Sequence, residues 1–192
     1  MDSQSYKEAL ADCTKHHATS ATFSGKFIRP HAPFIKEIVD RLGCRSILDY
    51  GCGKGEQYRW RNADETGSIP VGMTLEEYWC VPVTKYDPAW PPYAAEPVGT
   101  FDMVICSSVL RWIPGPDIPA VVDRLYSLAR KAIYVAEKLG PVKKSGKVRF
   151  QMVDYDAEGW ARVLRRDSDI EVTLATRYRG DDHSVNVNRT KV

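Results

Sequence analysis

The segment from Ile47 to Gly55, which reads Ile-Leu-Asp-Tyr-Gly-Cys-Gly-Lys-Gly, constrains the fold more than any other part of the chain. Two aliphatic residues and an acid end a short apolar run, and three glycines follow at alternate positions. Glycine adopts left-handed backbone angles without strain, and it leaves no Cβ in the way of a close approach. The pattern therefore predicts a buried strand that ends in a loop whose backbone approaches another group closely.

The spacing of these glycines excludes two phosphate-binding motifs. A dinucleotide-binding fingerprint needs its third glycine one position later, where Glu56 stands. A P-loop ends in Gly-Lys followed by Ser or Thr, whereas here Lys54 precedes Gly55 and Glu56. Neither motif fits this chain.

Length and composition indicate one ordinary globular domain. The chain has 192 residues, of which 43% are hydrophobic and 27% charged, which suits one core and not two. The net charge of +2 argues against a dedicated nucleic-acid-binding protein. Five cysteines, an odd number without any Cys-x-x-Cys pair, favour reduced thiols over disulfides or a zinc site, so no metal is expected.

The sequence carries no pattern typical of export or membrane insertion. Its N-terminal residues lack the basic start and apolar core of a signal peptide, and no apolar run reaches 18 residues. We therefore expect a soluble, cytoplasmic protein that does not associate with membranes.

Strand and helix patterns alternate along most of the chain. The strands that we expect cover residues 45–50, 81–87, 101–107 and 132–136, with an antiparallel pair at 170–178 and 184–188. The helices that we expect cover residues 4–17, 34–42, 117–131 and 156–166, with one more directly after Gly55 and a short one capped by Thr74. This order predicts an α/β, doubly wound, mostly parallel sheet that ends in a C-terminal antiparallel hairpin.

The glycine segment resembles motif I of the class I S-adenosylmethionine (AdoMet)-dependent methyltransferases, and residues 101–114 resemble their motif IV. With Tyr86-Asp87-Pro88, these segments are similar to a group of small bacterial and phage methyltransferase-like proteins. The similarity extends from about Phe23 to Trp160.

The resemblance implies a Rossmann-like fold in a single methyltransferase domain over residues 1–192. Residues 1–44 would form an N-terminal helical lid, and residues 45–192 would form the AdoMet-binding core and the acceptor side. The resemblance implies AdoMet as the cofactor, wrapped by the glycine loop. Asp49 would reach toward the ammonium group of the ligand, usually through water, because a carboxylate complements a cation.

The strand end at residues 106–108 would offer backbone carbonyls to the methionine amino group. The implied cofactor-binding residues are Phe23, Gly25, Asp49, Tyr50, Gly51, Gly53, Gly55, Tyr58, Asp87, Pro88, Cys106, Ser107 and Ser108.

Asp87 ends the second expected strand, where Rossmann-like sheets place a carboxylate that accepts hydrogen bonds from ribose hydroxyls. The alternative is a turn aspartate before Pro88, a common pairing. The separation of 87 − 49 = 38 positions is longer than the ~20 of a plain strand–helix–strand unit, so an irregular insertion is expected between the two acids.

The link between the second and third expected strands is too short for another crossover. Asp87 and Phe101 are 101 − 87 = 14 positions apart, and a helical crossover alone needs ~10–12 residues. Four prolines interrupt the link, and proline withholds ladder donors. We therefore predict that the family's third strand is missing and that residues 81–87 form an edge strand. The link would cover that edge and bring Trp90 or Tyr93 near the adenine side of the cleft.

The acceptor side is less well marked than the cofactor side. Trp112 would either face the acceptor pocket or belong to the core under the following helix. Lys143 and Lys144 belong to a basic loop, which is either solvated or the binding site of an anionic acceptor.

No catalytic base is identified by the sequence, and His31, Tyr6 and Tyr58 are weak candidates. Related proteins commonly have Thr-Asp and Glu-His where this chain has Ser107-Ser108 and Arg111-Trp112, so a histidine at the second position is absent. Because the sulfonium is already activated, alignment supplies much of the rate and no strong base is needed.

These observations predict AdoMet-dependent methyl transfer to a small-molecule acceptor, by O- or N-methylation. One alternative is a non-catalytic AdoMet-binding partner of a larger complex. Another is an RNA or DNA methyltransferase, although the charge makes nucleic acid the less favoured partner.

Overall fold

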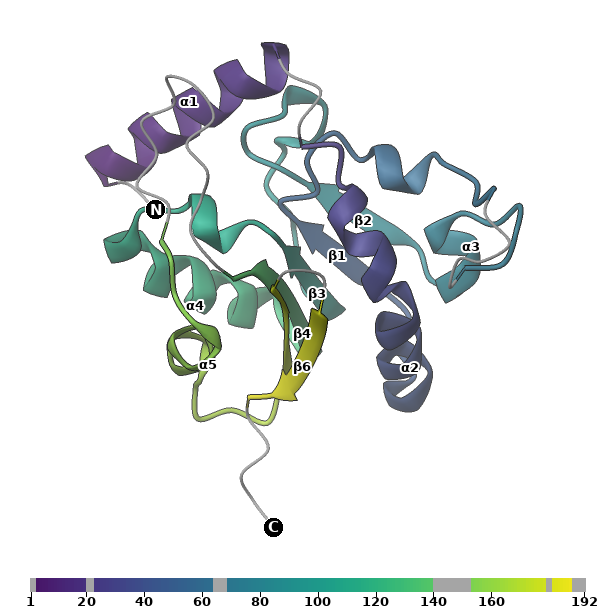
Figure 1. Cartoon of the computed structure of the whole chain (residues 1–192). Coiled ribbons are helices and arrows are strands. Elements are labelled where there is room, and N and C mark those ends of the chain that lie inside the picture. The colour runs from purple at the N-terminus through teal and green to yellow at the C-terminus, as the bar shows by residue number, and fades with distance from the viewer. Residues whose placement is uncertain (1–2, 20–22, 64–68, 140–152, 179–180, 188–192) are drawn as a thin grey trace.

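The computed structural model describes residues 3–19, 23–63, 69–139, 153–178 and 181–187, and it has an α/β fold around one six-stranded sheet (Figure 1). The strand order is β2-β1-β3-β4-β5-β6; β1 to β5 run parallel and β6 is antiparallel to β5. The strands are β1 (Ile47–Tyr50), β2 (Val83–Tyr86), β3 (Phe101–Ser107), β4 (Ala129–Lys138), β5 (Glu171–Tyr178) and β6 (Asp181–Asn186). The predicted Rossmann-like fold class, with its C-terminal antiparallel pair, is confirmed.

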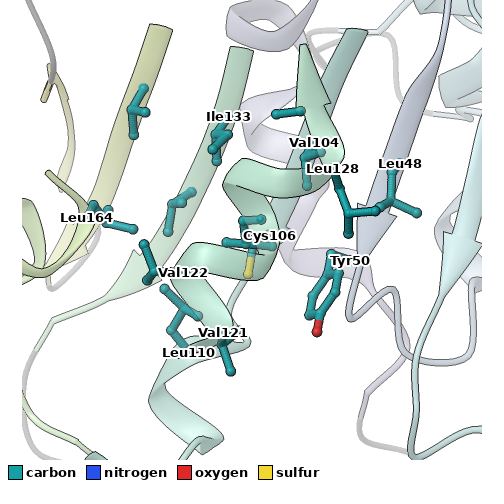
Figure 2. Close-up of a cluster of buried hydrophobic side chains, with 14 of the residues drawn as sticks. Leu48, Tyr50, Val104, Cys106, Leu110, Val121, Val122, Leu128, Ile133 and Leu164 are labelled. Carbon is teal, nitrogen blue, oxygen red and sulfur yellow. The ribbon is translucent and has the colours of Figure 1, made fainter. Parts of the chain in front are cut away.

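Helices cover both faces of this sheet. The α-helices are α1 (Gln4–Thr19), α2 (Ala32–Leu42), α3 (Leu75–Trp79), α4 (Ile118–Leu128) and α5 (Ala157–Leu164). Along β3, Val104 and Cys106 join the core under α4 and α5, whereas Met103 and Ile105 join the core under α2 and α3. Because successive strand residues point to opposite faces, the two cores lie on opposite sides of the sheet. Figure 2 shows part of the core under α4.

The helix boundaries follow from local capping and periodicity. Gly43 ends α2 in the left-handed conformation, with φ 57°. The Thr74 side chain accepts the Glu77 backbone N–H while the Glu77 carboxylate accepts the Thr74 N–H, a capping box that begins α3. The buried stripe of α4 consists of Ile118, Val121, Val122, Leu125 and Leu128.

The edge position predicted for the second strand is confirmed. Within the described part of the chain β2 pairs only with β1, and residues 88–100 contain no strand. The one regular element in residues 88–100 is a short 3₁₀ helix, Pro91–Tyr93. The Tyr93 carbonyl accepts a hydrogen bond from the Asp87 N–H at 3.0 Å. The link therefore folds back on the end of β2 instead of adding a strand.

Two sequence predictions are wrong. No α-helix follows Gly55; a 3₁₀ helix, Glu56–Tyr58, turns instead, because the side chains of Gln57 and Tyr58 are drawn inward to hydrogen-bond Asp49. The helix expected over 117–131 ends at Leu128, since residue 129 already pairs with Phe101 and begins β4. Among the described residues, no helix is both long and apolar enough to span a membrane.

Candidate functional site

A cavity of about 360 Å³ lies where the carboxyl ends of β1, β2 and β3 meet α1. Its volume is within the ~300–1,000 Å³ typical of small-molecule pockets. β1 has β2 on one side and β3 on the other, and parallel α/β sheets bind ligands at such a switch point. In Figure 1, α1 lies beyond this end of the sheet, apart from the helices on its two faces.

Most of the residues implied by the motifs line this cavity. Those that do are Phe23, Gly25, Tyr50, Gly51, Gly53, Asp87, Pro88, Ser107 and Ser108, and the acceptor-side candidate Trp112 lines it as well. Asp49, Gly55, Tyr58 and Cys106 do not, which differs from the prediction.

The glycine loop is packed tightly against the rest of the protein. Gly51, Gly53 and Gly55 all have left-handed backbones, with φ of 83°, 61° and 63°. A Cβ at Gly51 would overlap Val109, one at Gly53 would overlap the Phe23 carbonyl oxygen, and one at Gly55 would press on the Tyr93 ring at 2.7 Å. The alternate glycines are therefore required by close approaches within the protein itself, in addition to any approach of a ligand.

Asp87 ties this loop to the end of β2. Its Oδ2 accepts the Gly53 N–H at 2.8 Å, and its Oδ1 accepts the Ala89 N–H at 2.9 Å. The second bond is the turn geometry that the sequence offered as the alternative to ribose binding. The carboxylate is 7% exposed and lines the cavity, so ribose binding stays a prediction that is compatible with this structural role.

Asp49 lies behind the loop, within a buried polar cluster. Its Oδ2 accepts the Tyr58 hydroxyl at 2.7 Å and the Gln57 amide at 3.2 Å, while its Oδ1 has no hydrogen-bond partner among the described residues. Burial raises the pKa of Asp49 to about 6, although the two donors act in the opposite direction. Tyr58, fully buried beside this carboxylate, has a strongly raised pKa and no access to the cavity.

One face of α1 forms the wall opposite the sheet. Tyr6, Leu10, Cys13 and His17, spaced at helical intervals, all line the cavity. Burial raises the pKa of Tyr6 to about 12, and that of Cys13 to about 12, so neither is an effective base or nucleophile near neutral pH.

The first turn of α1 is tied to the start of α4. The Ser3 and Ser5 hydroxyls both donate to Asp117 Oδ2, at 2.8 and 3.1 Å. This contact holds the N-terminal end of the cavity wall in place.

His17 and Phe23 close the cavity between α1 and the glycine loop. The His17 ring stacks on Phe23, with centroids 4.5 Å apart and an interplanar angle of 11°, and its centroid is 5.7 Å from that of Trp90. Phe23 has a left-handed backbone, φ 59°, and its carbonyl accepts the Lys54 N–H at 2.8 Å. The sequence did not single out His17, although its helical spacing from Tyr6 and Cys13 places the three on one face.

The ends of β3 and β4 form the other rim. The Ser107 hydroxyl is buried and has no hydrogen-bond partner among the described residues. Ser108 is left-handed, with φ 58°, an unfavourable conformation for a residue other than glycine. Glu137, at the end of β4, accepts the Leu110 N–H at 2.8 Å, and burial raises its pKa to about 8.

The structure places one other predicted residue away from the cavity and does not describe two more. His31 is buried against Tyr134, whose hydroxyl is 3.1 Å from its Nδ1, in the core under α2, so it does not line the cavity. Lys143 and Lys144 lie outside the described residues. Lys26 and Lys138, which the sequence did not indicate, are the lysines that line the cavity.

The described residues contain no group of three or more His, Cys, Asp or Glu side chains arranged to hold a metal ion. The site is therefore characterised by its glycine loop, one cavity-lining carboxylate, an unpaired hydroxyl and an aromatic lid. Comparisons with models of protein families, with curated proteins and with solved structures found no match to this chain.

Proposed function

We propose that the protein is an AdoMet-dependent methyltransferase that methylates the oxygen or nitrogen of a small molecule. The observation that carries this proposal is the position of the cavity. It brings together the glycine loop after β1, the carboxylate after β2 and the hydroxyl after β3 at one switch point of a Rossmann-like sheet.

The chemical character of the lining suits this cofactor. Asp87 offers a carboxylate to the ribose hydroxyls, because each of its oxygens accepts only one backbone N–H and retains a further lone pair. The Ser107 hydroxyl, buried without a partner, offers a hydrogen bond to a polar ligand group. Phe23 and Trp112 present aromatic surface, which attracts a cationic sulfonium.

When bound, AdoMet would supply an electrophilic methyl group on a positively charged sulfur. The protein's own contribution would then be alignment and exclusion of water. Trp112 and Phe23, whose ring centroids are 5.1 Å apart at 71°, would fix the acceptor side, and α1 would cover the cavity. Alignment of this kind accelerates a two-substrate reaction without a strong base.

Lys26 and Lys138 favour an acceptor that carries negative charge. Both line the cavity, and their ammonium groups lie over the rings of Trp60 and Phe27, at 4.1 and 5.9 Å from the centroids. A carboxylate or phosphate on the acceptor would pair with these cations.

Direct binding tests the proposal first. Isothermal titration of the wild-type protein with AdoMet and with its demethylated product, S-adenosylhomocysteine, should give saturable one-to-one binding. NAD⁺, whose fingerprint the glycine spacing excludes, serves as the control and should not bind. Absence of binding to both adenosyl ligands would refute the assignment. If they bind, incubation with AdoMet and a panel of small acids, amines and phosphates should identify the acceptor by the formation of S-adenosylhomocysteine.

A protein that binds AdoMet without transferring the methyl group is the second candidate. The observation in its favour is the contact of Phe23 with Trp112, together with the edge contact of His16 on Phe23, which narrows the acceptor side. Tight binding of AdoMet with no turnover on any acceptor would favour this alternative. Turnover should then also stay absent in Phe23→Ala, which opens the cavity.

A further inference from the structure

His17 and Asp87 face one another across a gap that is too wide for a hydrogen bond. The Nε2 of His17 lies 3.9 Å from Oδ2 of Asp87, although His17 is only 3% exposed and Asp87 only 7%. A polar pair at this separation in a ligand cavity commonly has a third group between its members. Both residues line the cavity, so a ligand atom can reach this gap.

The gap has the dimensions of one hydroxyl oxygen. An oxygen about 2.8 Å from each atom satisfies normal hydrogen-bond lengths. Because the two atoms are 3.9 Å apart, the angle Nε2···O···Oδ2 at that oxygen would be roughly 90°. That angle suits a hydroxyl, which donates one hydrogen bond and accepts another. An aliphatic group at the same place would leave the Nε2 of His17 without a hydrogen-bond partner at this gap.

The proton inventory of the pair also matches a hydroxyl. Burial lowers the pKa of His17, so the ring is neutral near pH 7, with one N–H and one bare nitrogen. The facing carboxylate favours the N–H at Nε2, while Nδ1 has no hydrogen-bond partner among the described residues. Oδ2 of Asp87, which already accepts a hydrogen bond from the Gly53 N–H, has a lone pair left to accept one more hydrogen bond.

We propose that His17 and Asp87 form a hydroxyl-binding pair, in which Asp87 accepts a hydrogen bond from a ligand hydroxyl and His17 donates a hydrogen bond from Nε2–H to the same oxygen. The inference rests on the proposed function, since the hydroxyl that we assign is one of the two on the ribose of AdoMet. His17 thereby becomes a specificity-determining residue delivered by α1. The stack of its ring on Phe23 holds the nitrogen in register with the carboxylate.

The experiment combines variants of His17 with ligands that lack one hydroxyl. His17→Phe keeps the aromatic stack but removes the donor, whereas His17→Gln places an amide N–H near the former Nε2. Thr14→Val removes a polar group on the exposed face of the same helix, outside the cavity lining, and is the control. Each protein is titrated with S-adenosylhomocysteine and with its 2′-deoxy and 3′-deoxy forms.

For S-adenosylhomocysteine, His17→Phe should weaken binding roughly three- to ten-fold, the range for one neutral hydrogen bond. His17→Gln should recover most of that loss, and Thr14→Val should show none. With the one deoxy ligand that lacks the bridged hydroxyl, wild type and His17→Phe should bind equally, whereas the other deoxy ligand should preserve the difference.

An equal loss on all three ligands, or no loss on any, would overturn the hydroxyl-binding pair while leaving the proposed function intact. Failure of the wild type to bind S-adenosylhomocysteine would overturn both. If His17→Phe does not fold, His17→Asn replaces it, because its amide is too short to reach the Nε2 position, and the same comparison with His17→Gln applies.

Discussion

The two rims of the cavity differ in how fully their cavity-lining polar side chains are hydrogen-bonded. On the rim built by β1 and β2, Asp87 accepts two backbone N–H groups and every glycine of the loop abuts another residue. On the rim built by β3 and β4, the cavity-lining Ser107 hydroxyl has no hydrogen-bond partner among the described residues. The rim at the ends of β1 and β2, here called the glycine rim, is therefore hydrogen-bonded and packed within the protein. The rim at the ends of β3 and β4, here called the serine rim, presents an unpaired hydroxyl to the cavity.

The difference predicts whether a substitution on each rim should affect folding, ligand binding or both. Changes on the glycine rim should disturb folding and binding together, because the same contacts serve both. Removal of the cavity-lining hydroxyl on the serine rim should separate them, since an unpaired buried hydroxyl contributes little to stability but is available to a ligand.

Gly53→Ala should have the largest effect, because it combines backbone strain with a steric overlap. The left-handed backbone, φ 61°, costs about 1–2 kcal/mol for alanine. The collision of the new Cβ with the Phe23 carbonyl should add about 1–3 kcal/mol, as overpacking does. Urea unfolding should therefore show a loss of about 2–5 kcal/mol in the free energy of unfolding.

Gly43→Ala provides the matched control for this prediction. Gly43 has nearly the same backbone, φ 57°, but no atom lies within 4 Å of its added Cβ. It should lose only the strain component. Equal losses in the two variants would mean that the Phe23 segment yields freely, and the glycine rim would then be less tightly assembled than described.

Glu137→Gln should stabilise the protein at alkaline pH, with the second largest effect. Burial raises the pKa of Glu137 to about 8 from its ordinary 4.5, so the folded state retains the proton longer than the unfolded chain does. The protonated Glu137 therefore adds to the stability of the wild-type protein. This contribution is fully present below about pH 4.5 and is lost as the pH rises through about 8. At pH 9 the variant should exceed wild type by the order of 2–4 kcal/mol in free energy of unfolding.

Asp49→Asn is the corresponding change at a buried carboxyl behind the glycine rim. Two side-chain donors limit the rise of the Asp49 pKa to about 6, so its effect on stability should be complete by that pH and no further change should follow toward pH 8. Chemical denaturation of both variants from pH 4 to 9 separates the two intervals. If Glu137→Gln tracks wild type over the whole range, the carboxyl of Glu137 is not held neutral by burial.

The sequence predicted the glycine rim better than the serine rim, for a physical reason. The glycine pattern reflects backbone angles and close approaches, which are local. On the serine rim, β3 itself was predicted at its exact residues because its apolar run is continuous, but the polar contacts at its end were not predicted. The short 3₁₀ turn after Gly55 was missed because it depends on Asp49, whose burial draws Gln57 and Tyr58 inward.

Two contacts between segments far apart in the chain escaped prediction. His17 meets Asp87 seventy positions later, and only the docking of α1 on the sheet brings the two together. Glu137 was missed because glutamate is ordinarily exposed, and its burial follows from the way residues 108–112 fold over the end of β4. Neither feature has a local sequence pattern.

Asp87→Ala should weaken binding of S-adenosylhomocysteine by about 1.5–3 kcal/mol, the range for hydrogen bonds to a charged group. It should also lower the melting temperature without ligand, because the Gly53 and Ala89 N–H groups lose their acceptors. Calorimetric titration and a ligand-free melt measure the two effects. A collapsed melt without a folded state would favour a purely structural role as a turn residue.

Ser107→Ala should have the smallest effect and should separate the two rims most clearly. The Ser107 hydroxyl is buried without a partner, so its removal deletes no protein hydrogen bond and should leave the free energy of unfolding within about 0.5 kcal/mol of wild type, or slightly above it. Affinity for S-adenosylhomocysteine should nevertheless fall by about 0.5–1.5 kcal/mol, the contribution of one neutral hydrogen bond. Ser127→Ala is the control, because that hydroxyl donates to the Arg124 carbonyl on the exposed face of α4, so stability alone should change there. A Ser107→Ala protein that loses stability but binds normally would reverse the assignment of the serine rim, since its hydroxyl would then serve the fold and not the ligand.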